Sequence, residues 1–341
     1  MRVRDLAVLL NASYEGDGEV EIRAASAIES AGPSDLAFIG NRKAAGLART
    51  SHAGCIIVPL DFPDRGDLTT IPAREPRAAF ARAVAHLHPA RPLEAGIHST
   101  AVIADDADIH SSCFVGPHVH IAGGVRIGPN CSIGAGSSIG ASSVLGSDCV
   151  LHPGVAVYHD VEIGSRVVLH SGCIIGADGF GFVRIDGRYE KFPQIGRVRI
   201  EDDCEIGANT CIDRAALGVT RIGEGTKLDN LVHIGHNCDI GRHVVIAAQT
   251  GLSGGVIIED NAVIGGQVGI GDKARIQSGA VLGSGCGILT SKIVRGGQVV
   301  WGTPARPLKE HLQQLASLAR LPKLAEEVET LKRRLAKLES P

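Results

Sequence analysis

An aliphatic residue recurs at every sixth position over most of the chain from Ile97 onwards. The stretches 97–175, 200–212 and 222–288 keep this period, and the residue after the aliphatic one is often glycine. The period is typical of a hexapeptide β-helix, in which three short strands make one triangular coil of about 18 residues with the aliphatic side chains inside. Coils stack at about 4.8 Å, so we expect roughly ten coils in a prism about 45–50 Å long.

Two interruptions break the period. The shorter runs from Leu217 to Arg221, and the longer is a glycine-rich insertion at 176–199. The longer insertion gathers aromatic side chains that are scarce elsewhere, namely Phe180, Phe182, Tyr189 and Phe192. This clustering favours one wall of a ligand site. The alternative is a loop that only packs on its own prism or on a neighbouring one.

Residues 1–96 show no repeat and predict a small α/β domain. We expect a short helix near Leu6–Leu10, a buried strand over Gly54–Pro59 that proline closes, and an amphipathic helix over Ala78–His88. The β-helix is expected over 97–300.

The segment 301–341 is expected to be a helical extension. It predicts two helices, 308–321 and 324–339, broken at Pro322. Apolar residues of the second helix follow the spacing of a coiled-coil seam, namely Leu324, Val328, Leu331, Leu335 and Leu338. So short a seam is not stable alone, which predicts association with copies of itself or with the prism.

The composition narrows the class of protein. Aromatic residues make up 3% of the chain and Met occurs once, which suits a scaffold of small and β-branched residues. A net charge of −3 gives no electrostatic case for nucleic acid. The apolar run Leu6–Leu10 is too short for a signal sequence, and no stretch approaches about 18 apolar residues. We therefore expect a cytoplasmic protein without an integral membrane segment.

Most of the nine cysteines occupy one position of the repeat. That position takes a small side chain, and a free thiol packs as a small hydrophobe. No CxxC pair occurs, so we expect neither a metal site nor a disulfide framework. The cysteines at this position are Cys113, Cys131, Cys149, Cys173, Cys204, Cys238 and Cys286.

His236 is the strongest catalytic candidate among the 14 histidines. Asp229 precedes it by seven residues, so the two lie on neighbouring hexapeptides of one coil, and an aspartate can orient an imidazole and stabilise its protonated form. One coil of about 18 residues beyond His236 lies Gly254. A glycine N–H there could stabilise a tetrahedral oxyanion. His159 has the same repeat position as His236 but no such acid before it.

Several motifs together resemble the UDP-3-O-(3-hydroxyacyl)glucosamine N-acyltransferases of lipid A biosynthesis over essentially the whole chain. They are Gly176–Phe182, Pro193–Arg197, Gly207–Thr210, Ile212–Arg214, Asp229–Asn230, His236–Asn237 and Gly265–Gln267. The resemblance implies a left-handed β-helix, a homotrimer with active sites between adjacent subunits, an N-terminal uridine-binding domain and a C-terminal extension that contacts acyl carrier protein.

The resemblance also implies roles for particular residues. His236 matches the general base, Asp229 its carboxylate partner, and Gly254 the oxyanion donor. Substrate binding is implied for Phe38 and Asn41, which match the uracil-binding segment, and for Asn230, Phe180 and Lys273. Two positions depart from the family pattern. Ala44 stands where many members have a tyrosine beside the uracil, and Lys273 where many have a second active-site histidine.

The expected reaction transfers a 3-hydroxyacyl chain from acyl carrier protein to the 2-amino group of UDP-3-O-(3-hydroxyacyl)glucosamine. The product is a UDP-2,3-diacylglucosamine, and no cofactor or metal is needed. One alternative is the related UDP-N-acetylglucosamine O-acyltransferase. Two others are a zinc-dependent β-helix enzyme like the γ-type carbonic anhydrases, to which His233 and His236 would contribute, and a non-catalytic scaffold.

Overall fold

The computed structural model describes residues 1–41, 45–63, 67–89 and 94–339. The chain forms two compact units, Met1–Pro92 and Leu93–Pro341, so the boundary falls slightly before the one expected at residue 96. Within the described residues, no helix is both long enough and apolar enough to cross a bilayer.

The N-terminal unit is a small α/β domain, as predicted. Its four strands are parallel and pair in sequence order. A buried apolar cluster that includes Leu6, Leu36 and Ile57 joins the first helix to the sheet. Its elements are α1 Val3–Leu9, β1 Ala24–Ala25, β2 Asp35–Phe38, α2 Ala45–Thr50, β3 Cys55–Pro59, β4 Thr70–Ala73 and α3 Pro76–Leu87.

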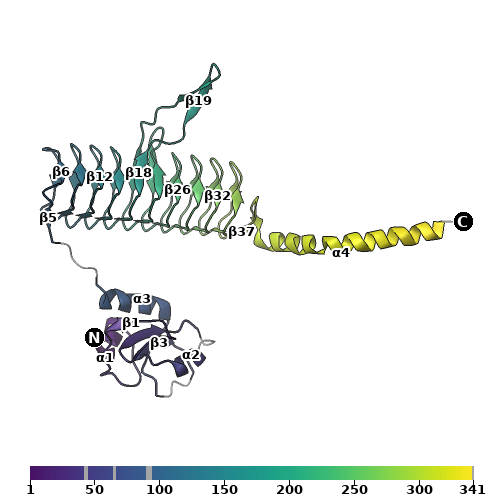
Figure 1. The fold of residues 1–341 in the computed structure, drawn as a ribbon, viewed down its shortest axis with the longest axis horizontal. Coiled ribbons are helices and arrows are strands. Elements are labelled where there is room, and N and C mark those ends of the chain that lie inside the picture. Colours follow the sequence, from purple (N-terminus) through teal and green to yellow (C-terminus); the bar gives the residue numbers. More distant parts are fainter. Residues whose placement is uncertain (42–44, 64–66, 90–93, 340–341) are drawn as a thin grey trace. The chain divides into compact units, whose positions relative to one another are not determined.

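The second unit is a three-faced parallel β-helix (Figure 1). Face I contains β5 Gly96–Ile97, β8 Phe114–Val115, β11 Ser132–Ile133, β14 Val150–Leu151, β17 Val168–Leu169, β22 Glu205–Ile206, β25 Lys227–Leu228, β28 Val245–Ile246, β31 Val263–Ile264, β34 Val281–Leu282, β37 Val299–Trp301 and the antiparallel β38 Arg306–Pro307. Face II contains β6 Val102–Ile103, β9 His120–Ile121, β12 Ser138–Ile139, β15 Ala156–Val157, β18 Ile174–Ala177, β23 Cys211–Asp213, β26 His233–Ile234, β29 Gly251–Leu252, β32 Gly269–Ile270 and β35 Gly287–Ile288. Face III contains β7 Asp108–Ile109, β10 Arg126–Ile127, β13 Val144–Leu145, β16 Glu162–Ile163, β21 Arg197–Ile200, β24 Val219–Ile222, β27 Asp239–Ile240, β30 Ile257–Ile258, β33 Arg275–Ile276 and β36 Ile293–Val294.

The register of the faces confirms the period predicted from the sequence. Ile127 pairs with Leu145 on the next coil, and Ile234 pairs with Leu252. Faces II and III have ten strands each, which matches the expected number of coils. Beyond the first coil, in which Ile97 is exposed and Ile103 and Ile109 are partly buried, the aliphatic residues of the repeat form one continuous buried cluster along the axis. Each coil therefore buries its apolar side chains against its neighbours.

The position that takes cysteine is also a hydrogen-bonding position. The Cys131 thiol donates to the Gly146 carbonyl at 3.1 Å, and the Cys149 thiol donates to the Gly164 carbonyl at 3.0 Å. Ser143 and Thr226 donate in the same way from the same repeat position. The thiols therefore pack as small side chains, as predicted, and they also bind the corners of successive coils together.

The interruptions and the C-terminal extension depart from the regular coil. The longer interruption forms a hairpin of β19 Phe182–Ile185 and β20 Arg188–Lys191 that rises from the β-helix (Figure 1). The extension is one helix, α4 Leu308–Glu339, with Pro322 inside it. The expected break at Pro322 is wrong, because loss of one N–H and local bending do not stop the helix-forming residues on either side.

Candidate active site

Both interruptions of the repeat, His236 and Gly254 lie at the corner between faces II and III, in consecutive coils. The longer interruption leaves this corner after β18, and the shorter one leaves it a coil later, after β23. His236 follows β26 at the same corner of the next coil, and Gly254 follows β29 one coil beyond. Two interruptions thus lie directly before the coil of His236.

His236 lies against Gly254, as the register predicts. A Cβ placed on Gly254 would come within 2.6 Å of both Cε1 and Nε2 of His236, so only glycine leaves room for the ring. The Gly255 N–H donates to the His236 carbonyl at 2.8 Å. The Gly254 N–H donates to none of the residues that the structure describes. The ring of His236 therefore lies against a glycine whose backbone N–H is unpaired among the described residues.

The longer interruption covers this histidine from the other side. Gly179 approaches so closely that a Cβ there would lie 2.5 Å from the Cβ of His236. Phe180, 85% exposed, lines the same pocket of about 640 Å³ as His236 and Gly254. Gln194 is 8% exposed, and its Oε1 has no hydrogen-bond partner among the described residues. The insertion thus contributes Phe180 to the pocket, whereas its other aromatic residues, Phe182, Tyr189 and Phe192, do not line it.

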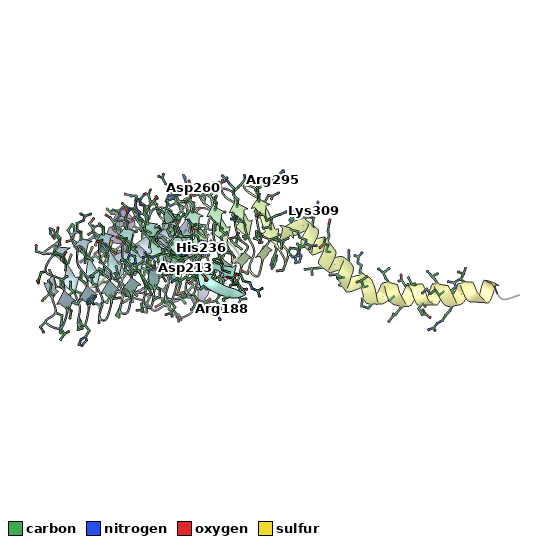
Figure 2. The ribbon with its side chains drawn as sticks, turned by 90° about the horizontal axis from the view of Figure 1, so that it is seen from above. Arg188, Asp213, His236, Asp260, Arg295 and Lys309 are labelled. Carbon is green, nitrogen blue, oxygen red and sulfur yellow. The ribbon has the colours of Figure 1, made fainter. Side chains whose placement is uncertain are left out.

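Asp213 is the carboxylate of this pocket. It ends β23 on the preceding coil, and its side chain is only 9% exposed. Asp213 Oδ2 is 3.7 Å from Nε2 of His233. Burial raises the pKa of Asp213, and the nearby His233 and His236 partly oppose that rise. Figure 2 shows Asp213 and His236 close together on the β-helix.

Asp229 is not at His236 within one chain. Its carboxylate lies at the corner between faces I and II, where it accepts from the Asn230 N–H at 2.8 Å and from the Ala248 N–H at 3.1 Å. Asn230 Oδ1 accepts from the Ala208 N–H at 2.7 Å. The expected pairing of Asp229 with His236 is absent here because the intervening residues carry the chain along face II to a different corner.

Comparison with known proteins places this geometry in a family. Residues 19–86 match the family model described as UDP-3-O-(3-hydroxymyristoyl) glucosamine N-acyltransferase. Residues 106–141, 142–177 and 220–254 match the bacterial transferase hexapeptide model, and 197–230 and 255–288 match the hexapeptide repeat of succinyl-transferase.

Relatives named UDP-3-O-acylglucosamine N-acyltransferase match most of the chain. The protein of Pseudomonas paraeruginosa is 40% identical over 336 residues, covering 98% of this chain and 95% of the relative. That of Pseudomonas syringae pv. tomato is 42% identical over 256 residues, covering 74% of this chain and 72% of the relative. The chain belongs to the UDP-3-O-acylglucosamine N-acyltransferase family. It is accordingly an acyltransferase.

The fold of this N-acyltransferase extends to a second kind of enzyme. The solved Arabidopsis UDP-N-acetylglucosamine acyltransferase is 26% identical, with a TM-score of 0.50, and the match covers 64% of this chain and 76% of that one. The β-helix is left-handed, as the resemblance implied.

Arg214 fastens the aromatic insertion of the N-acyltransferase to its β-helix. The guanidinium is 1% exposed, and its Nε donates to the Gly176 carbonyl at 2.8 Å. A second nitrogen donates to the His159 carbonyl at 2.8 Å, and Asp178 Oδ1 is 3.9 Å from Nε. Arg214 belongs to the motif Ile212–Arg214, but the sequence alone assigned no function to this residue. Its burial beneath the loop shows that the role is structural support of the pocket wall.

The remaining predicted residues are not among those that line this pocket. Lys273 follows β32 at the same corner as His236, two coils on, and its N–H donates to the Gly254 carbonyl at 3.0 Å. Phe38 ends β2 in the N-terminal unit, with its ring 4.8 Å from that of Phe80. Asn41 is exposed in the same unit, and Ala44 lies outside the described residues.

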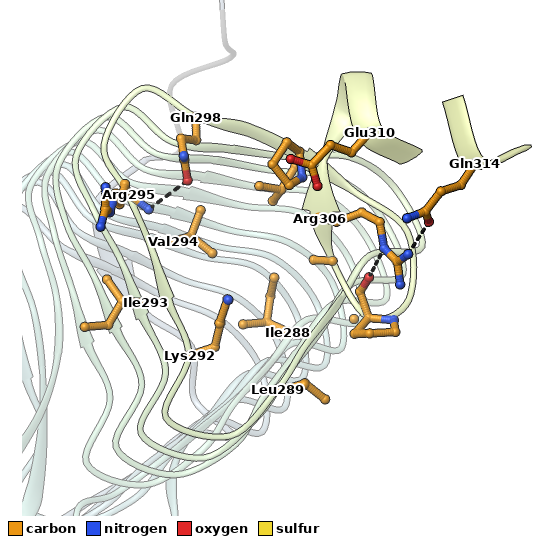
Figure 3. Close-up of a pocket in the computed structure, with 15 residues that line it drawn as sticks. Ile288, Leu289, Lys292, Ile293, Val294, Arg295, Gln298, Arg306, Glu310 and Gln314 are labelled. Carbon is orange, nitrogen blue, oxygen red and sulfur yellow. Dashed lines mark hydrogen bonds between the residues drawn. The ribbon is translucent and has the colours of Figure 1, made fainter. Parts of the chain in front are cut away.

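A second pocket lies at the last coil of the β-helix, away from His236. It has a volume of about 510 Å³, and Lys292, Arg295 and Arg306 line it together with the first turns of α4 (Figure 3). Arg306 donates to the side chain of Gln314. Among the described residues, no three His, Cys, Asp or Glu side chains are grouped so that they could bind a metal ion.

Proposed function

We propose that this enzyme transfers a 3-hydroxyacyl chain from acyl carrier protein to the 2-amino group of UDP-3-O-(3-hydroxyacyl)glucosamine in lipid A biosynthesis. The observation that carries the proposal is the contact of the His236 ring with Gly254, whose N–H has no partner among the described residues. A base and an oxyanion donor are the two groups that attack of an amine on a thioester requires.

The proposed step is direct transfer. The amine nitrogen forms a bond to the thioester carbon while His236 removes a proton from it, and the Gly254 N–H donates to the oxygen that becomes negative. The carbon–sulfur bond then breaks, and the protonated His236 returns the proton to the departing thiolate. The products are an amide and the free thiol of the carrier, so atoms and charge balance without a cofactor or metal.

Asp213 is proposed to stabilise the imidazolium that His236 becomes. It is a buried carboxylate that lines the same pocket. Opposite charges in a pocket of low polarity attract strongly even without direct contact. This part of the proposal gives Asp213 the charge-stabilising role that the sequence assigned to Asp229.

Asp229 keeps a proposed role only in an assembly. We propose a homotrimer in which Asp229 and Asn230 of one subunit approach the His236 pocket of the next. The longer interruption supports association, because Phe180 and Tyr189 within it are largely exposed in the single chain. So does α4, whose apolar side chains from Leu312 to Leu335 are about half exposed. Light scattering on the purified protein would test the trimer.

The carrier protein is proposed to dock at the C-terminal extension. Lys292, Arg295 and Arg306 make this end of the β-helix basic (Figure 3), which suits an acidic partner. Charge reversal at Arg295 should raise KM for the carrier-bound donor and leave KM for a small pantetheine thioester unchanged. An equal rise with both donors would contradict this docking site.

The N-terminal unit is proposed to bind uracil through Phe38 and Asn41, with Phe180 and Lys273 contacting the rest of the acceptor.

A cytoplasmic location is also part of the proposal. The nine cysteines are free, and eight of them are buried, which suits a reducing compartment.

One turnover assay tests the function. The enzyme and its His236→Ala variant would receive a 3-hydroxyacyl carrier thioester with either UDP-3-O-acylglucosamine or UDP-N-acetylglucosamine. Amide formation with the first acceptor alone, lost at least about a hundredfold in the variant, supports the proposal. Ester formation with the second acceptor would favour the O-acyltransferase, whose fold this chain shares. Turnover that survives in the variant would remove His236 from the mechanism.

A further inference from the structure

The two interruptions of the repeat meet at one side chain, that of Asn237. The Ala216 N–H donates to Asn237 Oδ1 at 3.0 Å, and Asn237 Nδ2 donates to the Leu217 carbonyl at 2.8 Å. The Asn237 N–H donates to Thr220 Oγ1 at 2.9 Å. The shorter interruption is thus closed around the asparagine that follows His236.

The longer interruption is fastened to the same structure. As it returns to the β-helix, the Ile195 N–H donates to the Ala216 carbonyl at 3.0 Å, and the Gly196 N–H donates to the Ala215 carbonyl at 3.0 Å. One connected set of hydrogen bonds therefore runs from the aromatic wall of the pocket through residues 215–217 to Asn237.

These bonds fix the orientation of the Asn237 amide. Its oxygen faces the Ala216 N–H and its nitrogen faces the Leu217 carbonyl. Flipping the amide would place its NH₂ group against the Ala216 N–H and its oxygen against the Leu217 carbonyl, so both hydrogen bonds would be lost. The oxygen also lies 3.1 Å from Nδ1 of His236. A neutral imidazole that meets an acceptor at Nδ1 carries its proton there. This assignment leaves Nε2, the nitrogen beside Gly254, with a free lone pair.

We propose that Asn237 is a positioning residue that holds His236 as the Nδ1-protonated tautomer with Nε2 ready to accept a proton, and that the shorter interruption serves to hold Asn237. The inference rests on the proposed function for its catalytic meaning. The left-handed backbone of Asn237 does not by itself require this side chain. Many corners of the β-helix have the same backbone with other residues, such as Gln249 and Lys273.

Other charged or titratable groups also face His236. Asp213 and His233 lie on the preceding and same coils, and Asp272 lines the pocket from two coils beyond. Asp178 in the covering loop pairs with Lys191. Among the described residues, however, only Asn237 has an acceptor within hydrogen-bonding distance of Nδ1.

The test compares three variants. Asn237→Ala removes the acceptor, and Asn237→Asp keeps an oxygen there and adds a negative charge. Asn261→Ala is the matched control, since Asn261 has the same left-handed backbone and an exposed side chain at another corner. Asn237→Ala should lower kcat roughly ten- to a hundredfold, the usual effect of losing a group that orients a functional imidazole. KM for both substrates should stay within about twofold, and Asn261→Ala should behave as wild type.

The pH profile separates positioning from a merely structural role. The acid limb of kcat/KM should move to lower pH in Asn237→Ala and to higher pH in Asn237→Asp, because the acceptor and then the added charge stabilise protonated His236. An unmoved acid limb in both variants would overturn the inference. So would equal losses of activity in Asn237→Ala and Asn261→Ala.

A spectroscopic measurement keeps the inference separate from the proposed reaction. Nitrogen NMR of histidine-labelled wild type, with the His236 signals identified by their loss in His236→Ala, reports the tautomer without turnover. Nδ1 should give a protonated and Nε2 an unprotonated nitrogen signal above the titration range. The reverse pattern would overturn the inference even if the enzyme acylates the expected amine. The expected pattern in a protein that acylates neither acceptor would uphold the inference and refute the proposed function.

Discussion

His159 and His236 occupy the same corner of the β-helix, three coils apart, and each is followed by a residue with left-handed backbone. The difference lies in their neighbours. Nδ1 of His159 is 2.7 Å from the Asp160 carboxylate and 3.3 Å from buried Arg214. His236 instead has a neutral amide at Nδ1 and Gly254 against Nε2. The comparison indicates that a histidine at this corner can act as a base where a glycine on the next coil leaves room for its ring and offers a free N–H.

The largest expected effect comes from deleting each histidine in turn. His236→Ala should lose at least about a hundredfold in kcat, because the base is gone. His159→Ala should cost much less, since that side chain is 55% exposed and does not line the pocket. Steady-state kinetics of both variants measure the contrast. A comparable loss in both would mean that the corner as a whole, rather than His236, carries the activity.

Filling the space at Gly254 should be nearly as damaging. The added methyl group of Gly254→Ala would lie 2.6 Å from two ring atoms of His236, so the imidazole must leave its place. We expect a loss of about a hundredfold in kcat, in the range found when an oxyanion site is disabled. Gly266→Ala is the control, because its nearest neighbour would be the Ala248 carbonyl at 3.3 Å. Similar kinetics for the two variants would remove the special status of Gly254.

Asp213→Asn should lower kcat moderately and raise the stability of the folded protein at neutral pH. Loss of the charge should lower kcat about tenfold, equivalent to about 1.4 kcal/mol, and move the acid limb of the rate profile to lower pH. Because burial raises the pKa of this acid in the folded protein, folding becomes less favourable as pH rises from its ordinary value of 3.8 through the folded value.

The stability part of this prediction has a clear readout. Asp213→Asn should melt at a higher temperature than wild type at neutral pH, and the advantage should disappear in acid, where the wild-type carboxyl is protonated as well. Thermal melts across the pH range measure it. A variant that is less stable than wild type at neutral pH would show that the Asp213 charge is satisfied in the folded protein.

The smallest effect is expected in the regular coils. Cys131→Ser should change the free energy of unfolding by about 1 kcal/mol or less, because Ser143 already makes the equivalent hydrogen bond at this repeat position. Chemical denaturation measures it. A much larger loss would mean that the thiol is needed for its packing rather than as a small donor.

The fold could be predicted almost completely, because the inward direction of Ile127 or Ile234 follows from a period that the chain repeats at every coil. Gly254 was placed correctly for the same reason, since only regular coil separates it from His236. Adding about 18 residues per coil does not predict which residues are neighbours across the two interruptions. Asp213 and Asn237 received no role because the inserted loops hide which residues lie beside His236. Asp229 and His236 do lie on neighbouring hexapeptides, as their spacing predicts. They lie at different corners of the coil, however, so their side chains do not meet within one chain.

The distribution of the thiols has a consequence for how this solenoid could come apart. Eight cysteines occur at intervals from Cys113 near one end of the β-helix to Cys286 near the other, and all of them except Cys211 are buried. Burial raises the pKa of Cys238 to about 12 and that of Cys204 to about 11, so a closed coil resists alkylation. Each buried thiol reacts only when its own coil opens. The protein therefore contains a series of natural reporters that can record, coil by coil, whether unravelling begins at the ends or at the interrupted middle.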